Sequence, residues 1–148
     1  MIIEGALDQI NENDLIELEN QINIKIPEQY RNFLLSNNGG KPKINRFTTQ
    51  DKKVESMIAK FLPLANIEED NLLEEIEGIT QADLIPQNLI PIATDPADNR
   101  LVLSVAGSDM GKIYYWSWDE EPRRKYRPSY KYMRLVADSF DDLLALLH

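Results

Sequence analysis

Residues 26–40 read IPEQYRNFLLSNNGG, a short segment with a marked beginning and a marked end. Pro27 suits the first position of a helix, where its missing N–H costs no hydrogen bond. Three apolar side chains then follow at helical spacing and form one stripe, namely Tyr30, Phe33 and Leu34. The asparagines and glycines that follow tolerate left-handed dihedrals, which end a helix and turn the chain. The sequence therefore predicts a short core helix with a sharp stop at each end.

Three further segments show helical periodicity. They are residues 14–22 (DLIELENQI), residues 66–78 (NIEEDNLLEEIEG) and residues 139–147 (SFDDLLALL). In each of them the apolar side chains recur at helical spacing, which places them on one face of a helix. The expected core positions are Leu15, Leu18, Ile22, Ile67, Leu72, Leu73, Ile76, Phe140, Leu143, Leu144 and Leu147.

Capping residues predict where these helices begin and end. Asp14 is expected to cap the first helix, with Glu17 completing a capping box. Gly78 is expected to stop the second helix. Asp138 or Ser139 is expected to cap the last one.

The second half of the chain is rich in predicted strands. The apolar runs LIPIA (89–93) and RLVLSV (100–105) flank the turn TDPADN, and GKIYYWSW (111–118) follows the turn AGSDMG. Tight turns between apolar runs predict antiparallel hairpins. The run YMRLVA (132–137) is a further strand candidate.

Weaker signals lie between the helical segments and these hairpins. Residues 41–56 predict a loop or a weak edge strand, and residues 57–65 (MIAKFLPLA) predict a strand that Pro63 excludes from a central position. Helices at both ends with hairpins between them are typical of an α+β fold. We expect a single domain, residues 1–148, in which a mainly antiparallel sheet packs against N-terminal and C-terminal helices.

The composition is that of a globular protein. The chain has 148 residues, 43% of them hydrophobic and 28% charged, which suffices for a domain with a real core. It has no cysteine, which excludes disulfides, thiol catalysis and cysteine-ligated zinc. No apolar run has membrane-spanning length, and the first residues lack the pattern of a signal peptide. These features predict a cytoplasmic location.

The charge is strongly negative and unevenly distributed. With 25 acidic and 16 basic side chains the formal net charge is −9, which repels nucleic acid and anionic membranes and attracts basic partners. We therefore expect neither a nucleic-acid nor a membrane partner. The acidic tract comprises Glu68, Glu69, Asp70, Glu74, Glu75, Glu77, Asp83, Asp95 and Asp98, and the basic run comprises Arg123, Arg124, Lys125, Arg127, Lys131 and Arg134. Most of these are expected to be solvated surface charges, but the tract is also a candidate docking surface.

No catalytic constellation is visible in the sequence. The only histidine is the last residue, His148, so no histidine-based triad can be assembled. No glycine-rich phosphate-binding motif occurs, and neither a cofactor nor a metal site is expected. The acidic turn TDPADN (94–99) has the residue types that hairpin turns require. A metal-dependent hydrolase is a minor alternative, built on Asp95, Asp98, Asp119, Glu120 and Glu121.

Aromatic side chains occupy both faces of the predicted strand at residues 113–118. Tyr114, Trp116 and Trp118 are expected to share one face because side chains alternate along a strand. Tryptophan is most often a core residue, so burial is the favoured interpretation. Either the terminal helix or a partner would then cover the second face, and exposed tryptophans carry much of the binding energy of protein interfaces.

The segment quoted first, taken with its surroundings, resembles the signature of the SMI1/KNR4 family, also called the SUKH superfamily. The matching positions are Glu19, Ile26, Pro27, Tyr30, Phe33, Leu34, Asn38, Gly39 and Gly40. Four downstream segments follow in the order that this family shows: FLPL (61–64), LIPIATDPADNRLVL (89–103), KIYYWSWDEE (112–121) and VADSFDDLLALL (136–147). The resemblance covers nearly the whole chain and implies an α+β domain.

The resemblance also implies binding without catalysis. Bacterial members act as immunity proteins that neutralise a toxin, often a nuclease or a deaminase, whereas eukaryotic relatives act as regulatory scaffolds. We therefore expect a non-enzymatic domain whose partner is a cognate, basic protein toxin. The alternative is a regulatory scaffold or sensor that binds endogenous proteins or a small ligand. The predicted partner-binding residues are Trp116, Trp118, Asp119, Glu120, Glu121, Asp95 and Asp98.

Overall fold

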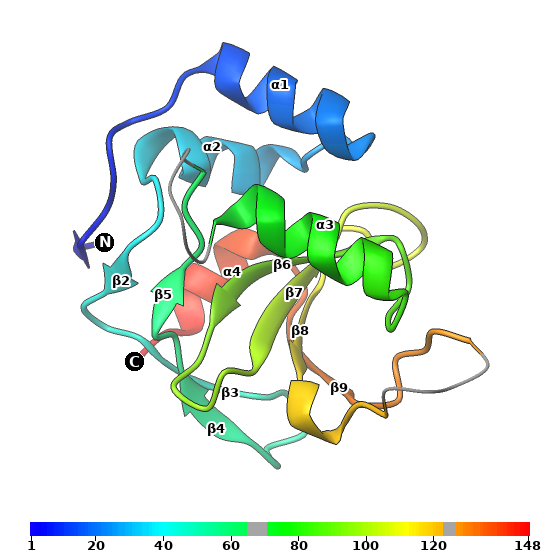
Figure 1. Cartoon of the computed structure of the whole chain (residues 1–148). Coiled ribbons are helices and arrows are strands. Elements are labelled where there is room, and N and C mark those ends of the chain that lie inside the picture. Colours follow the sequence, from blue (N-terminus) through cyan, green and yellow to red (C-terminus); the bar gives the residue numbers. More distant parts are fainter. Residues whose placement is uncertain (65–70, 123–126) are drawn as a thin grey trace.

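The centre of the molecule is a five-stranded antiparallel sheet, with strand order β5-β6-β7-β8-β9 (Figure 1). The structure is a computed structural model that describes residues 1–64, 71–122 and 127–148. The strands are β5 (Lys60–Phe61), β6 (Leu89–Thr94), β7 (Arg100–Ser104), β8 (Ile113–Trp116) and β9 (Met133–Ala137). Neighbours in the sheet are also neighbours along the chain, so the predicted antiparallel hairpins are confirmed.

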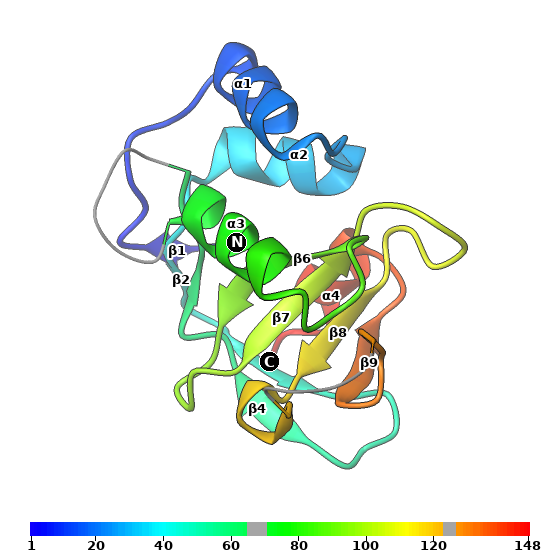
Figure 2. The same ribbon diagram turned by 45° about the vertical axis from the view of Figure 1, so that its right-hand side comes forward.

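In the described part of the chain four α-helices surround this sheet, which confirms the predicted α+β fold. They are α1 (Glu12–Ile22), α2 (Glu28–Ser36), α3 (Leu72–Ala82) and α4 (Phe140–Leu146). Figures 1 and 2 show α3 and α4 on opposite faces of the sheet, with α1 and α2 stacked at one end. Among the described residues, no helix is long and apolar enough to span a membrane.

An aromatic cluster joins α2 to the sheet and to α4. Phe33 contacts Phe61 of β5 and Phe140 of α4, with ring centroids 4.7 and 4.9 Å apart. Tyr30 contacts the same Phe140 ring at 5.2 Å. The predicted stripe of Tyr30, Phe33 and Leu34 is therefore buried, and the helix quoted first lies in the main core.

The second face of the sheet has a smaller core of its own. Its buried members are Leu84, Ile85, Leu89, Val102 and Trp116. Tyr114 and Trp118 pack against this cluster, so the predicted shared face of the aromatic strand is confirmed. Helix α3 and the segment that follows it cover this face, whereas the terminal helix α4 lies on the other one.

The first predicted helix cap was displaced by one turn. Asn11 caps α1, and Asp14 occupies the third helical position of a reciprocal capping box, with hydrogen bonds of 3.0 and 2.9 Å. The prediction of Asp14 as cap and Glu17 as its partner was wrong, because Asn11 offers an equally good cap one turn earlier. Ser139, the second of the two candidates, caps α4.

The predicted stop of α3 at Gly78 was also wrong. The helix is capped by Asn71, continues through Gly78 and ends at Asp83, which is left-handed with φ 52°. Interior glycine weakens a helix without ending it when the apolar face continues beyond it, as it does here at Ile79. The earlier part of the predicted helix, including Ile67, lies outside the described residues.

Residues 41–64 form short strand pieces. Strand β1 (Ile3–Glu4) pairs with β2 (Lys41–Pro42), and β3 (Arg46–Thr48) pairs with β4 (Glu55–Met57). The long strand predicted for residues 57–65 was wrong in extent: β5 has only two residues and ends before Pro63, as a missing N–H requires. Residue 65 is not among the described ones.

Asn38 and Gly39 form a buried junction after α2. The Asn38 side chain donates to the carbonyls of Asp8 and Leu64, both at 2.9 Å, and accepts from the Leu64 N–H at 2.7 Å. Gly39 has φ +78°, and a Cβ built on it would lie 2.7 Å from the Cβ of Pro63. Only glycine permits this approach, so the asparagine and the glycine together fix the N-terminal segment and residue 64 against the end of α2.

Both edges of the five-stranded sheet carry further main-chain contacts. At the β5 edge, Phe61 donates its N–H to the carbonyl of Gly40 at 2.7 Å. At the β9 edge, the turn between β3 and β4 packs against the strand, and the Gln50 N–H donates to the Leu135 carbonyl at 2.8 Å. Asp51 in this turn accepts from Arg134 of β9 at 2.7 Å. The hairpin tip is thereby held on the sheet edge.

We predict opposite effects for two glycine-to-alanine substitutions. Gly39→Ala should lower the free energy of unfolding by about 3 kcal/mol, because it adds left-handed strain and a clash with Pro63. Gly78→Ala should raise it by about 0.5–1 kcal/mol, since its Cβ would meet nothing within 4 Å and alanine favours the helix. Urea unfolding of both variants measures the two changes. Equal changes would contradict the requirement for glycine at position 39.

The Asp51 contact predicts an acid-sensitive contribution to stability. Hydrogen bonds from the Thr49 hydroxyl and the Lys53 N–H, together with the Arg134 guanidinium, lower the pKa of Asp51 to about 2. Because the folded-state pKa lies below the unfolded value of about 3.9, the contribution is present above about pH 4 and lost toward pH 2. Thermal melting of wild type and Asp51→Asn should differ at neutral pH and converge in acid. A difference that persists unchanged at about pH 2 would refute it.

Candidate functional site

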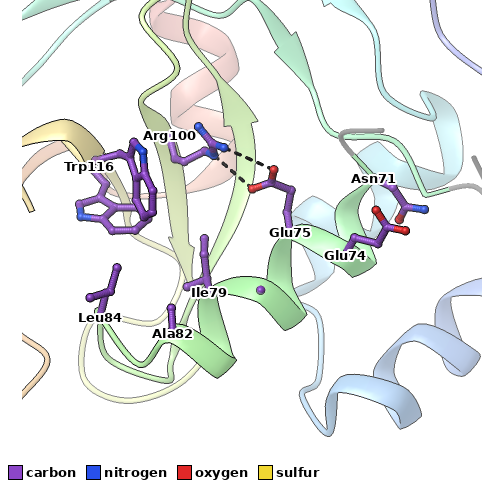
Figure 3. Close-up of a pocket in the computed structure, with 10 residues that line it drawn as sticks. Asn71, Glu74, Glu75, Ile79, Ala82, Leu84, Arg100 and Trp116 are labelled. Carbon is purple, nitrogen blue, oxygen red and sulfur yellow. Dashed lines mark hydrogen bonds and ion pairs between the residues drawn. The ribbon is translucent and has the colours of Figure 1, made fainter. Parts of the chain in front are cut away.

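A groove of about 400 Å³ lies between α3 and the 3-10 helix η1 (Trp118–Glu120) (Figure 3). Helix α3 supplies one side, and β7, β8 and η1 supply the other. The lining residues are Asn71, Glu74, Glu75, Gly78, Ile79, Ala82, Leu84, Arg100, Trp116 and Trp118. The groove thus brings the acidic tract and the aromatic strand, which are separate in sequence, to one place on the surface.

The two tryptophans differ in their environment. Trp116 is 0% exposed, and its indole N–H donates to Glu121 at 2.9 Å. Trp118 is half-buried and packs edge-on against Trp116, with ring centroids 5.3 Å apart and an interplanar angle of 81°. Trp116 is therefore the core member of the pair, while Trp118 presents aromatic surface to the groove.

Arg100 joins the two sides of the groove through an ion pair, drawn in Figure 3. Its guanidinium donates to both carboxylate oxygens of Glu75, at 3.1 and 3.3 Å, and to Asp98 at 2.9 Å. Burial alone would lower the pKa of Arg100, but the two carboxylates outweigh it and the pKa lies above its ordinary value. The positive charge in the groove is therefore already paired.

Three of the predicted partner-binding residues, Trp116, Glu121 and Asp95, are buried, and for Trp116 this agrees with the favoured interpretation as a core residue. Trp116 packs in the second core, and Glu121, only 3% exposed, accepts its indole N–H. Asp95 is 7% exposed because its carboxylate accepts from Tyr115, Ser56 and two backbone N–H groups of the turn. Satisfied hydrogen bonds offset the burial of these charges.

Of the remaining predicted residues, Asp98, Asp119 and Glu120 are exposed and Trp118 is half-buried. Trp118 lines the groove, and Asp119 and Glu120 follow on the exposed part of η1. Asp98 lies in the exposed turn after β6 and bonds Arg100. Within the described part of the chain, Glu74, Asp119 and Glu120 have no ion pair or hydrogen bond through their carboxylates.

The contributions of Gly78, Ala82 and Arg100 to the groove were not predicted. Glu74, Gly78 and Ala82 are spaced by one helical turn, so a helix extended past Gly78 would have shown that they share a face. Nothing in the sequence near Arg100 indicates that it lines the groove, because its partner Glu75 lies 25 residues earlier in the chain. Three members of the acidic tract (Glu68, Glu69 and Asp70) and three of the basic run (Arg123, Arg124 and Lys125) lie outside the described residues.

The groove combines apolar and charged side chains. Ile79, Ala82, Leu84 and the two tryptophans supply apolar surface, and Glu74, Glu75 and Arg100 supply charged groups. Among the residues that the structure describes, no group of three or more His, Cys, Asp or Glu side chains is arranged to hold a metal ion. Two residues of the hydrolase alternative, Asp95 and Glu121, have buried carboxylates that accept hydrogen bonds from within the protein.

The sequence as a whole matches the model of the SMI1 / KNR4 family (SUKH-1) over residues 9–146. The chain belongs to this family. A relative in Bacillus subtilis (strain 168), the SPbeta prophage-derived uncharacterized protein YokK, is 28% identical over 159 residues, which cover 95% of this chain and 76% of that protein. The crystal structure of a protein from Pseudomonas syringae pv. tomato has a similar fold, with a TM-score of 0.52 and 20% identity over 79% of this chain and 74% of the other.

The structure gives physical roles to the SMI1/KNR4 signature. Glu19 of α1 accepts the Ile26 N–H at 2.8 Å and the Arg31 guanidinium at 2.8 Å, which fixes α1 against the start of α2. Asn38 and Gly39 make the junction described above. None of these residues lines the groove, so the N-terminal signature stabilises the fold and the groove is built from other elements.

Truncation of the two tryptophans should separate their roles in stability. Trp116→Ala removes a fully buried side chain and should lower the free energy of unfolding by about 4 kcal/mol. Trp118→Ala removes a half-buried side chain and should lower it by about 1–2 kcal/mol. Urea unfolding followed by circular dichroism measures both, and losses of the same size would contradict the assignment of Trp116 to the core.

Proposed function

We propose that this chain is a non-catalytic, cytoplasmic immunity protein that binds a cognate protein toxin and neutralises it. Membership of the SMI1/KNR4 family supports a binding role. The observation that carries the proposal is the groove beside α3, in which accessible tryptophan surface is bordered by carboxylates that no described side chain neutralises.

The charge of the protein suits a basic partner. The formal net charge is −9, and Glu74, Asp119 and Glu120 add local negative potential at the groove. A nuclease-type toxin has to hold nucleic acid, so its own binding surface must be basic. Such a surface would be steered toward the groove, and the immunity protein would occupy the place of the nucleic acid.

The aromatic wall of the groove suits the centre of an interface. Tryptophan is among the residues that contribute most to binding when a partner desolvates it, and surrounding charged residues exclude water and set orientation. Trp118 is held in place by its edge-on contact with the buried Trp116. The side chain is therefore ordered before the partner arrives, which lowers the entropic cost of binding.

The proposal predicts that a toxin is encoded beside the gene for this chain, and this toxin is the partner for the test. Co-expression should restore growth of cells that produce the toxin, and the two purified proteins should form a complex of defined stoichiometry in size-exclusion chromatography with light scattering. Absence of both protection and a complex would refute the immunity function. Protection without a stable complex would refute neutralisation by direct binding.

Two variants should affect different steps of binding. Asp119→Lys combined with Glu120→Lys should slow association and reduce its salt dependence, because it removes steering charge. Trp118→Ala should accelerate dissociation by about 30-fold, which corresponds to roughly 2 kcal/mol. Stopped-flow and surface-binding kinetics measure the two rates.

A matched control reverses the same number of charges elsewhere. Glu17 and Glu28 are exposed on α1 and α2, outside the groove. Glu17→Lys combined with Glu28→Lys should leave both rates close to wild type at moderate salt. Equal effects of the control and the groove variant would show that net charge, and not this surface, governs association.

A further inference from the structure

A second hollow, of about 530 Å³, lies beside α4 and is separate from the groove beside α3. Residues 1–2 and the turn between β2 and β3 form one side of it, and α4 with the residue that follows it forms the other. In addition to residues 1–2, the hollow is lined by Lys43, Ile44, Leu144, Ala145 and Leu147. We call it the apolar hollow, because Lys43 is the one charged side chain among its described lining residues.

The apolar hollow brings exposed hydrophobic side chains together. Seven large hydrophobic side chains are exposed among the described residues, and three of them lie here: Met1, Ile2 and Ile44, which are 61%, 64% and 61% exposed. A single exposed hydrophobic side chain is ordinary on a protein surface, but a contiguous group of them marks an interaction site. The grouping therefore indicates a surface that another molecule covers.

Main-chain hydrogen bonds fix both sides of the apolar hollow. On one side the Lys43 N–H donates to the Ile2 carbonyl at 2.9 Å, and Ile3 pairs with Pro42 between β1 and β2. On the other side His148 and Arg46 exchange two main-chain hydrogen bonds of 3.0 Å, which hold the segment after α4. The apolar side chains are therefore held at the surface before a partner binds, which lowers the entropic cost of association.

Two opposite charges border the apolar hollow, one on each side. Lys43 is exposed in the turn between β2 and β3, and Asp141 is exposed in the first turn of α4. Asp141 precedes Leu144 and Ala145 by three and four residues, so it lies on the same face of the helix as they do. Among the described residues neither Lys43 nor Asp141 forms an ion pair. Each side thus offers one uncompensated charge, and the two have opposite sign.

We propose that the apolar hollow is the interface of a homodimer, in which a second copy of this chain covers it about a two-fold axis that runs along the hollow. A two-fold interface brings the same patch of both copies together. With the axis in this direction, the turn after β2 of each copy lies over α4 of the other. Ile44 then packs on Leu144 and Ala145 of the other copy, and Lys43 pairs with Asp141 of the other copy at two equivalent places.

Electrostatics favour both this face and this direction of the axis. Each copy carries a formal net charge of −9, so contacts through most other surfaces bring like charges together. At the apolar hollow each copy instead offers one charge of each sign. An axis across the hollow would place Lys43 against Lys43, which is unfavourable, whereas an axis along it places Lys43 against Asp141.

A second copy also fits this surface better than the basic toxin proposed above, because the apolar hollow has no excess of carboxylates to attract one. Seven residues line the hollow, whereas a standard stable interface has about 20–30 residues a side. We therefore expect a weak dimer whose population rises with protein concentration.

The dimer goes beyond the proposed function and does not depend on it. The groove lies beside α3 and the apolar hollow beside α4, on the opposite face of the sheet (Figures 1 and 2). Two copies joined at the hollow therefore leave both grooves open, and one dimer can hold two toxin molecules.

Sedimentation velocity over a concentration series tests the inference. The average mass of the wild-type protein should rise from that of one chain toward that of two between about 10 μM and about 1 mM, the range of weak complexes. Ile44→Glu should stay monomeric, because it places a carboxylate at the centre of the interface. Ile16→Glu is the matched control: Ile16 is 47% exposed on α1, outside the hollow, and this variant should dimerise like the wild type. Circular dichroism checks that both variants are folded.

Charge reversal tests the direction of the axis. Lys43→Glu and Asp141→Lys should each weaken dimerisation by about tenfold, because each opposes like charges at two places. An equimolar mixture of these two variants should dimerise about as strongly as the wild type. In the mixed dimer the new glutamate faces the new lysine, and the native Lys43 faces the native Asp141.

Three results would overturn the inference. They are a wild-type protein that stays monomeric up to about 1 mM, an Ile44→Glu variant that dimerises like the wild type, and a mixture that dimerises as weakly as each charge variant alone. The first would leave the hollow to another occupant, the second would place the contact between copies on another surface, and the third would exclude the pairing of Lys43 with Asp141. Monomeric Ile44→Glu should still bind the toxin as the wild type does, so this inference and the proposed function are tested separately.

Discussion

The buried amide of Asn38 is the contact on which the arrangement of the other elements depends. It satisfies the carbonyl of Asp8 and both backbone groups of Leu64, and so joins the N-terminal segment, the end of α2 and the chain beyond β5. One residue earlier, the Pro63 carbonyl accepts the first N–H of α3, from Leu72, at 2.8 Å. The start of α3, and with it one side of the groove, is therefore positioned by the same junction.

Much of the fold could be predicted because its elements have strong periodicity. The stripe of Tyr30, Phe33 and Leu34 is buried as expected, and the hairpins between residues 89 and 137 pair as their turns indicate. Helix ends were less predictable, since several residues near each end are able to cap. Asn11 and Asp14 are both residue types that cap helices, and in the structure Asn11 is the cap while Asp14 is its partner in the capping box.

The site was harder to predict than the fold, for two physical reasons. First, charge on Asp95 and Glu121 suggested exposure, but the tyrosine, serine and indole donors that satisfy them come from other elements and are not visible locally. Second, the groove depends on the packing of α3 against β7, which brings Glu75 to Arg100 across a separation of 25 residues. Asp119 and Glu120 are exposed and Trp118 is half-buried, and the part of these three residues in partner binding stays a prediction.

The closed edges of the sheet limit how any other chain can recognise this one. Gly40 holds the outer side of β5 at Phe61, and the turn at Gln50 holds the outer side of β9 at Leu135. Main-chain groups at these points are occupied, so neither a partner nor a second copy extends the sheet there by adding a strand. At these edges a partner can be recognised only through side chains, because the main-chain groups already have hydrogen-bond partners within the protein. Exposed side chains can be substituted one at a time with little change in the free energy of unfolding. A domain of this kind can therefore acquire a different partner while its fold stays the same.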